Sequence, residues 1–377
     1  MTSLIQKLNQ IGQSIWYDNI ERKLLKDGTL EGMYNRGEIR GITSNPSIFN
    51  KAISQSDEYD DEIRSLTKEN LSRDNIYERL AISDIQTAAD LFRPLYDQTN
   101  GDDGYVSLEV SPYLAHDANQ TISEANMLWN EVNRPNLMVK IPATKAGLPA
   151  ITETIAAGIN VNVTLIFSLD RYREVREAYL AGLEKRASAG KTVANIASVA
   201  SFFISRIDTK VDKQLESLIK TATPEEKQRI EGLMGKAAVA SGKLAFQDYE
   251  DTFGDKGTLF GKLKPLGAKR QRVLWASTST KNPAYPDTKY VEEMIGPLTI
   301  NTVPPNTLEA FLDHGVVERT IDQNLEAAHN VMTGLSGVGI DLDQATQELE
   351  AEGVKSFADA YTSLLDSLQS RMHDFQK

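Results

Sequence analysis

The stretch NVNVTLIFSLDRYREVREAYLAGLEKRAS, residues 160–188, joins two kinds of segment that together decide the fold. Its first nine residues are mostly β-branched or apolar, which is typical of a buried parallel strand. Its last eighteen residues interleave charged side chains with Tyr179, Leu180 and Leu183, as an amphipathic helix does. Another apolar run follows at 192–201, so this part of the chain predicts a strand–helix–strand unit of a parallel sheet.

Short apolar runs of this kind recur along the whole chain. Eight of them fit buried parallel strands: SIWYD (14–18), GITSN (41–45), YVSLEVS (105–111), LMVKIP (137–142), NVNVTLIFS (160–168), TVANIASVAS (192–201), RVLWAST (272–278) and LTINTVP (298–304). Helical patterns separate them, for example over 116–133 and 145–157. Eight alternations of strand and helix predict an α/β fold, a closed (β/α)₈ barrel of the TIM type.

Two helical insertions and a helical C-terminal part are expected to enlarge this barrel. The insertions cover about 50–100 and 207–265, and the second contains TPEEKQRIEG, with a threonine cap, a proline and two early glutamates. C-terminal helices are expected over about 318–377, where apolar stripes such as Phe357, Tyr361 and Leu364 predict packing surfaces. Because no long linker interrupts the chain, we expect residues 1–377 to form a single domain.

The composition argues against several classes of protein. Lys and Arg number 41 against 53 Asp and Glu, and this net charge of −12 argues against a dedicated nucleic-acid binder. The chain has no cysteine, and its four histidines lack the spacing of metal ligands, so we expect no metal site. Long apolar runs and a signal-peptide pattern are both absent from the sequence, which predicts a cytoplasmic protein without a membrane partner.

Lys140 is the residue that most directly suggests chemistry. It lies inside the apolar run LMVKIP at 137–142. Burial disfavours the charged form of a lysine, and a neutral amine is the form that attacks a carbonyl group. The other interpretation is a lysine at the boundary between barrel and helices that reaches solvent along its stem.

Polar residues occur in several other predicted strands, in most cases near the carboxyl end. Three end their runs (Asp18, Asn45 and Ser201), one lies late in its run (Ser277), and three lie within their runs (Glu109, Asn162 and Thr164). The carboxyl ends of barrel strands converge on one pocket, where barrel enzymes keep their chemistry. Because Asp, Glu and Lys are costly to bury unpaired, we expect these residues and Lys140 to interact there.

The residues around these positions resemble the transaldolase family, in order and along the whole chain. The matching motifs are WYDNI (16–20), GITSNPSIF (41–49), SLEVSP (107–112), LMVKIPAT (137–144), NVNVTLIFS (160–168) and SVASFFISRID (198–208). The segment 274–304 resembles the longer-chain branch of this Schiff-base-forming family. The resemblance implies a (β/α)₈ barrel that acts on sugar phosphates without a cofactor, in the non-oxidative pentose phosphate pathway. The sequence leaves both a monomer and a homodimer open.

The resemblance also implies a mechanism. Lys140 attacks the C-2 carbonyl of a ketose phosphate, and the carbinolamine loses water to give an imine, a Schiff base. Glu109 and Thr164, with a water molecule, move the protons of this dehydration, and Asp18 takes the proton of the C-4 hydroxyl as the C-3 to C-4 bond breaks. The dihydroxyacetone unit stays on Lys140 until an aldose phosphate accepts it.

The binding roles implied by the resemblance concern the sugar and its phosphate. Asn45 and Asn162 hold the sugar hydroxyls and the enamine. Arg206 binds the phosphate, which suits its planar guanidinium. Ser201 and Ser277 add hydroxyl donors.

One departure from the shorter transaldolases affects the phosphate site. Those proteins place an arginine two residues after the serine that corresponds to Ser277, where this chain has Ser279. We expect Lys281 to supply the second positive charge. The alternative is a surface lysine beside a turn.

Two other functions compete with transaldol transfer. The first is a fructose 6-phosphate aldolase of the same superfamily, in which a tyrosine helps water to release the three-carbon unit. This chain has Phe203 at the position that we align with it, and an apolar ring there favours transfer over release. The second is a non-catalytic barrel that binds sugar phosphates, which needs Arg206 and Lys281 but has no use for a buried Lys140.

Overall fold

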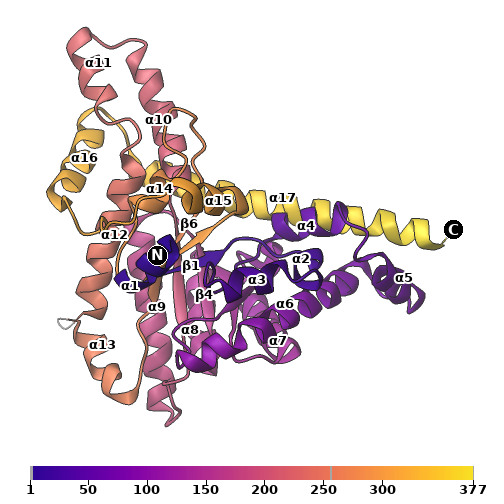
Figure 1. Ribbon diagram of the computed structural model, residues 1–377. Coiled ribbons are helices and arrows are strands. Elements are labelled where there is room, and N and C mark those ends of the chain that lie inside the picture. Colours follow the sequence, from indigo (N-terminus) through magenta and orange to yellow (C-terminus); the bar gives the residue numbers. More distant parts are fainter. Residues whose placement is uncertain (1–2, 255–256, 377) are drawn as a thin grey trace.

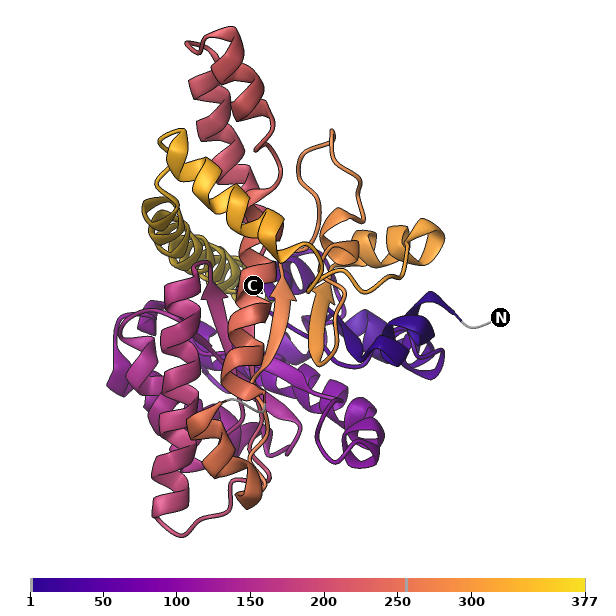
Figure 2. The ribbon, with the colours of Figure 1, turned by 90° about the vertical axis from the view of Figure 1, so that its left-hand side faces the viewer.

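The computed structural model describes residues 3–254 and 257–376. Seven parallel strands in these residues form one curled sheet, in the order β1-β7-β6-β5-β4-β3-β2. They are β1 (Gln13–Tyr17), β2 (Val106–Glu109), β3 (Leu137–Pro142), β4 (Val161–Ile166), β5 (Ser198–Phe203), β6 (Arg272–Ala276) and β7 (Thr299–Val303). In Figure 2 the arrows of these strands point towards the end of the molecule from which α10 (Ser205–Ile219) and α11 (Pro224–Glu231) project.

The predicted second strand, 41–45, takes no strand conformation but still closes the sheet into a ring. Ile42 makes a parallel bridge to Tyr17 on one side and to Val106 on the other. Four backbone hydrogen bonds of 2.9–3.0 Å join this segment to its neighbours, two on each side. Gly41 is needed here, because a Cβ atom would lie 2.8 Å from the indole ring of Trp16. The eightfold barrel is therefore confirmed, with one position reduced to a seam, which we define as residues 41–44.

Helices precede, follow and separate the strands in the described residues. Those of the first half are α1 (Leu4–Ile11), α2 (Arg22–Lys26), α3 (Thr29–Asn35), α4 (Pro46–Ser54), α5 (Asp60–Lys68), α6 (Arg73–Gln98), the 3₁₀ helix η1 (Pro112–Leu114), α7 (Ala118–Val132), α8 (Gly147–Ala157) and α9 (Leu169–Ser188). Those of the second half, after α10 and α11, are α12 (Ala237–Phe253), α13 (Thr258–Leu263), the 3₁₀ helix η2 (Lys264–Leu266), α14 (Lys289–Glu292), α15 (Pro305–His314), α16 (Leu325–Gly337) and α17 (Leu342–Gln376). Figure 1 shows their arrangement around the strands.

Both predicted insertions are helical in the structure. The first holds α4, α5 and α6, and the second holds most of α10 together with α11, α12 and α13. Helix α11 begins as its sequence predicts, since Thr223 caps it and shares a capping box with Glu226. The predicted strand 192–201 begins too early, because β5 starts only at Ser198.

Strand β4 ends in a bulge beside the centre of the barrel. Its register with β5 shifts between Val163 and Ile166, and Leu165 takes a φ of 60°. A left-handed backbone is costly for a leucine and is tolerated only where the surroundings hold it in place. The bulge lies directly after Thr164, so it affects the direction of the side chains at the end of this strand.

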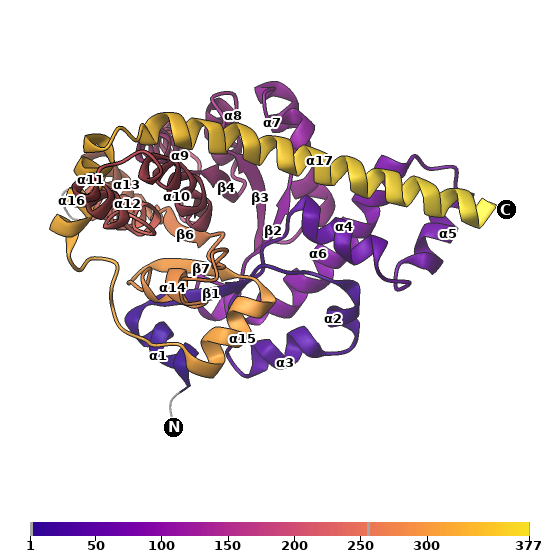
Figure 3. The same ribbon diagram turned by 90° about the horizontal axis from the view of Figure 1, so that it is seen from above.

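The C-terminal helix α17 runs across the carboxyl end of the barrel from the side of α16 to α5 (Figure 3). It contacts α10, β4, η1, α4, α5 and α6 along this path. Its predicted apolar stripe is a packing surface, with Tyr361, Leu364 and Leu368 all buried. The ring of Tyr361 packs edge-on against those of Tyr77 and Tyr113 at centroid distances of 5.3 Å.

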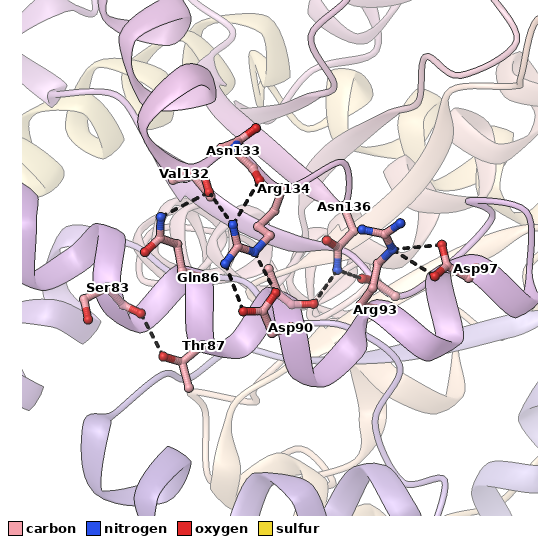
Figure 4. Close-up of polar contacts among 12 residues, drawn as sticks. Ser83, Gln86, Thr87, Asp90, Arg93, Asp97, Val132, Asn133, Arg134 and Asn136 are labelled. Atoms are coloured by element: carbon pink, nitrogen blue, oxygen red, sulfur yellow. Dashed lines mark hydrogen bonds and ion pairs between the residues drawn. The ribbon is translucent and has the colours of Figure 1, made fainter.

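The start of β3, the strand that carries Lys140, is anchored to α6 by polar contacts (Figure 4). The buried amide of Asn136 donates to the carbonyl oxygens of Ala89 at 2.8 Å and of Gly104 at 2.9 Å. Arg134 forms an ion pair with Asp90 at 2.6 Å nearer the surface. Because buried hydrogen bonds contribute more than exposed ion pairs, Asn136 is the stronger anchor of this strand.

Candidate active site

A cavity of about 220 Å³ opens at the carboxyl ends of the strands. Nine of the eleven predicted site residues line it: Asp18, Asn45, Lys140, Thr164, Ser201, Phe203, Arg206, Ser277 and Lys281. They come from elements that are far apart in the sequence, which the closed barrel brings together. This is the end of the barrel at which enzymes of this architecture carry out their chemistry.

Lys140 lies in the middle of β3, and its side chain points into the barrel. The residue is only 5% exposed, so the interpretation of a lysine that reaches solvent is wrong. Its Nζ donates a hydrogen bond of 2.8 Å to the carbonyl oxygen of Ser44, in the seam. Nζ also lies 3.3 Å from Oε2 of Glu109 and 5.9 Å from the ring centroid of Phe357. The amine is thus fixed in position and enclosed.

Asp18 directly follows β1 and is held by the seam on one side. Thr43 donates a hydrogen bond of 2.6 Å to Oδ1 of Asp18, and the Thr43 hydroxyl also lies 2.6 Å from that of Thr302. Burial raises the pKa of the Asp18 carboxyl above its usual range, while the Thr43 hydrogen bond and the charge of Lys140 oppose this effect. A carboxyl group in this state exchanges protons more readily near neutral pH than an exposed aspartate does.

Glu109 is the last residue of β2 and pairs in register with Lys140. Burial raises the pKa of its carboxyl, Lys140 opposes the rise, and Asp18 adds to it. Glu109 does not line the cavity but a separate space of about 20 Å³, and Asn45 lines both. Both carboxyl groups therefore interact electrostatically with Lys140, although Asp18 lines the cavity and Glu109 lines the smaller space.

Thr164 and Asn162 lie on β4 at different depths. The buried hydroxyl of Thr164 has no hydrogen-bond partner among the described residues and lines the cavity. Asn162 is fully buried and does not line it. Its amide donates to Oγ of Ser107 at 3.1 Å, and its Oδ1 accepts from Oγ of Ser201 at 2.6 Å. Since this bond uses the hydroxyl proton of Ser201, that serine is left with an oxygen that can only accept.

Asn45 caps a helix and also lines the cavity. Its Oδ1 accepts from the backbone N–H of Ile48 at 3.0 Å and so caps helix α4. Pro46 occupies the first turn of this helix. The cap fixes the side chain of Asn45, and the residue also lines the cavity.

Two positive charges lie at the far side of the cavity. Arg206 forms no ion pair or hydrogen bond with any described residue, and its guanidinium lies 5.5 Å from the ring centroid of Phe203. Burial lowers the pKa of Arg206. The pKa of Lys281 is also lowered, first by burial and then by the charge of Arg206. Two cations this close repel each other until an anion binds between them.

Several lining residues were not predicted from the sequence. Thr43, Thr302 and Phe357 border the cavity, and the carbonyl oxygen of Ser44 holds the Lys140 amine. The two threonines are polar residues at strand ends, so the rule that identified Asn45 also applies to them. Phe357 was expected only to pack, and it both packs and covers the cavity.

Comparison with known proteins agrees with this geometry. A family model described as "Transaldolase/Fructose-6-phosphate aldolase" matches residues 15–368. The chain belongs to this family. Members named "Transaldolase" include one from Trichodesmium erythraeum, 45% identical over 375 residues that make up 99% of this chain and 98% of the relative. Another, from Saccharopolyspora erythraea, is 46% identical over 374 residues, 98% of each chain.

Other members of the family named as transaldolases have similar identity. The one from Parafrankia is 45% identical over 373 residues, 99% of each chain. The family description names two activities, transaldolase and fructose 6-phosphate aldolase, whereas these relatives are named for the first alone. In residues 3–254 and 257–376 no helix has the length and apolarity that are needed to cross a membrane.

Proposed function

We propose that this enzyme transfers a dihydroxyacetone unit from sedoheptulose 7-phosphate to glyceraldehyde 3-phosphate, giving erythrose 4-phosphate and fructose 6-phosphate. The observation that carries the proposal is the enclosed Lys140 amine between two carboxyl groups, in a cavity that also holds two cations. An amine held beside acid–base groups forms imines with carbonyl substrates, and an imine withdraws electrons without a metal. The names of the relatives support the same reaction.

The proposed sequence of steps begins at the C-2 carbonyl of the ketose. The neutral amine of Lys140 adds to this carbon, and the carbinolamine loses water to give the imine. Glu109 protonates the leaving hydroxyl, and Thr164 holds the water that departs. Asp18 then takes the proton of the C-4 hydroxyl, and the C-3 to C-4 bond breaks. Erythrose 4-phosphate leaves, and the electron pair of the broken bond forms an enamine on Lys140.

The second half reverses these steps on a new aldehyde. The enamine carbon attacks the aldehyde of glyceraldehyde 3-phosphate, and Asp18 returns its proton to the new hydroxyl. Water then hydrolyses the imine and releases fructose 6-phosphate. The rings of Phe203 and Phe357 border the cavity and favour transfer, because they limit the access of water to the enamine before the acceptor arrives.

Asn45 and Asn162 have different roles in this proposal. Asn45 holds a sugar hydroxyl directly, since the residue lines the cavity. Asn162 acts through Ser201, which it orients by hydrogen bonding. Ser277 takes a left-handed backbone, with a φ of 54°, and its hydroxyl lies 3.1 Å from that of Ser205. This conformation keeps Ser277 on the cavity wall beside the phosphate cations.

A donor–acceptor assay tests transfer against aldol cleavage. With fructose 6-phosphate as donor, we expect glyceraldehyde 3-phosphate to accumulate in proportion to added erythrose 4-phosphate. Without an acceptor, release is expected to stop after one turnover per active site, because the three-carbon unit stays on the enzyme. Steady release of free dihydroxyacetone without acceptor would assign the aldolase activity, and no turnover at all would favour a binding protein.

The phosphate site gives a prediction about Arg206 and Lys281. We expect Arg206→Met to raise KM for fructose 6-phosphate by about 10- to 100-fold, the scale of a lost charge-assisted hydrogen bond. Lys281→Met should have a smaller effect, because Lys281 is more exposed. Steady-state kinetics of both single variants and the double variant measure their coupling.

Lys213→Met provides the control for this pair, since Lys213 is an exposed lysine on α10, the helix that carries Arg206. It should leave KM unchanged. If Lys281→Met also leaves KM unchanged, and the double variant behaves as Arg206→Met alone, Lys281 is a surface lysine beside a turn and the phosphate has a single cation.

The hydrogen bond from Thr43 to Asp18 predicts a change in pH dependence. This bond lowers the pKa of Asp18, and Asp18 must be ionised to take the C-4 proton. In Thr43→Val the pKa should rise further, so activity should begin to fall at a higher pH as the solution is acidified. We expect the acidic limb of the profile of log kcat against pH to move up by about one unit.

The control for this change is Thr87→Val on α6, whose hydroxyl bonds to the carbonyl of Ser83 and to no other described residue. It should keep the wild-type profile. A Thr43→Val limb that stays in place, or moves to lower pH, would contradict the assignment of Asp18 as the base.

A further inference from the structure

A second hollow lies at the opposite, amino end of the barrel. Its volume of about 450 Å³ is twice that of the catalytic cavity and falls within the range of small-molecule sites. It lies where strands begin, and it borders Ser14 on β1, Met138 on β3 and Ser198 on β5. Met138 precedes Lys140 by two residues on the same strand, so the two cavities lie on opposite sides of the barrel centre.

The charges around this hollow are predominantly positive. Four cations and two carboxylates line it, an excess of two positive charges in a chain whose net charge is −12. Two of the cations are paired: Arg40 with Asp103 at 2.7 Å, and Lys269 with Asp102 at 2.9 Å. Arg270 and Arg272 are the remaining two.

Neither remaining arginine has a carboxylate within hydrogen-bond distance among the described residues. Arg270 approaches Glu250 only at 3.9 Å. Arg272 donates to neutral oxygens alone, those of Asp102 (backbone), Ser14 (hydroxyl) and Thr299 (backbone), at 2.8–2.9 Å. Its Nε is buried and has no partner in the part of the chain described. The Arg270 guanidinium therefore remains available to an anion. Three of the five N–H groups of Arg272 are engaged by protein oxygens, so this arginine contributes mainly its uncompensated positive charge.

The walls of the hollow are largely apolar. Leu298, which is 44% exposed, and Ala197 line it, and the buried side chains of Val199, Ile300 and Tyr249 also border it. Burial raises the pKa of Tyr249, which Arg270 opposes, so the phenol stays neutral beside that guanidinium. Apolar walls with a few convergent charged groups are typical of sites for small molecules that have both an apolar and a charged part.

We propose that the amino-end hollow is a second ligand site, which binds a small organic anion with an apolar or aromatic body. The acid group lies against Arg270, whose planar guanidinium fork suits carboxylate, sulfonate or phosphate oxygens, and the positive charge of Arg272 adds to the attraction. The apolar body lies against Leu298 and Ala197, the large and the small apolar lining residues with the most accessible surface. The sugar phosphates of the catalytic cavity do not match these walls, because their hydroxyl groups would lose hydrogen bonds there.

Fluorescence titration with 8-anilinonaphthalene-1-sulfonate tests this site on the intact enzyme. The probe is an aromatic sulfonate whose emission rises in an apolar site. We expect one probe to bind per chain. Arg270→Met should weaken binding by about tenfold or more through the loss of a charge-assisted contact. Ala197→Leu, which adds side-chain volume on the wall of the hollow, should weaken it independently of charge.

Two controls locate the probe. Arg79→Met removes an exposed arginine of α6 and should leave binding unchanged. Arg206→Met removes a cation from the opposite cavity and should also leave it unchanged. Far-UV circular dichroism and transfer activity show that Arg270→Met and Ala197→Leu remain folded. No saturable binding, equal binding by both hollow variants and the wild type, or a loss of binding in Arg206→Met would each overturn the proposal.

Discussion

Replacement of Lys140 by methionine is expected to abolish transfer, with kcat lowered by at least about four orders of magnitude. Losses of this size follow the removal of a group that forms the covalent intermediate in other enzymes. Methionine is unbranched and similar in length, so it fills the space of the lysine side chain without the amine. The barrel should therefore remain folded, and the change reports on chemistry.

Borohydride trapping identifies the nitrogen atom that forms the imine and so tests this prediction directly. Wild-type enzyme reduced in the presence of fructose 6-phosphate should carry a three-carbon adduct on Nζ of Lys140, seen by peptide mass spectrometry. Lys140→Met should carry none. Lys145→Met is the matched control, because Lys145 is an exposed lysine five residues later, and it should be trapped as the wild type is. An adduct on another lysine would contradict the mechanism.

The second large effect is expected for Asp18→Asn, which should lower kcat by about 10²- to 10⁴-fold. The amide has nearly the shape of the carboxyl group but cannot accept the C-4 proton. Imine formation does not need this proton transfer, so the variant should form the Schiff base and then stop before the carbon–carbon bond breaks.

This arrest predicts a different mass after reduction. In Asp18→Asn, borohydride should trap the whole six-carbon sugar phosphate on Lys140, whereas the wild type carries three carbons. Asp251→Asn removes one exposed carboxylate from α12 and controls for net charge, so it should give the wild-type adduct. A three-carbon adduct in Asp18→Asn at the wild-type rate would assign the cleavage step to another base.

The strands could be predicted from the sequence because buried parallel strands are short apolar runs. The second run was the exception. GITSN is followed at once by a helix that Asn45 caps and Pro46 begins, so too few residues remain for a strand. The first part of the run at 192–201 is not a strand either, because an apolar composition does not by itself distinguish a loop segment from a strand.

The sequence predicts those residues of the site whose side-chain type indicates their chemistry. Asp18, Lys140 and Arg206 have side chains whose chemistry is evident in an apolar context. The contact between Lys140 and Ser44 was not predictable, because a backbone carbonyl is present at every residue and only the fold selects one. The depth of Asn162 also depends on the barrel, whose interior is filled in layers. Asn162 is the second residue of β4 and lies deeper than Thr164, so it does not reach the cavity.

The seam at 41–44 gives this barrel one segment on which both its closure and its chemistry depend. The same few residues complete the ring of backbone hydrogen bonds, hold the amine of Lys140 and hold the carboxyl group of Asp18. A local opening of the seam would break the ring and detach both groups in one event. Hydrogen–deuterium exchange at the amides of Ile42 and Thr43 therefore measures how often this segment opens, and with it how often both contacts are lost.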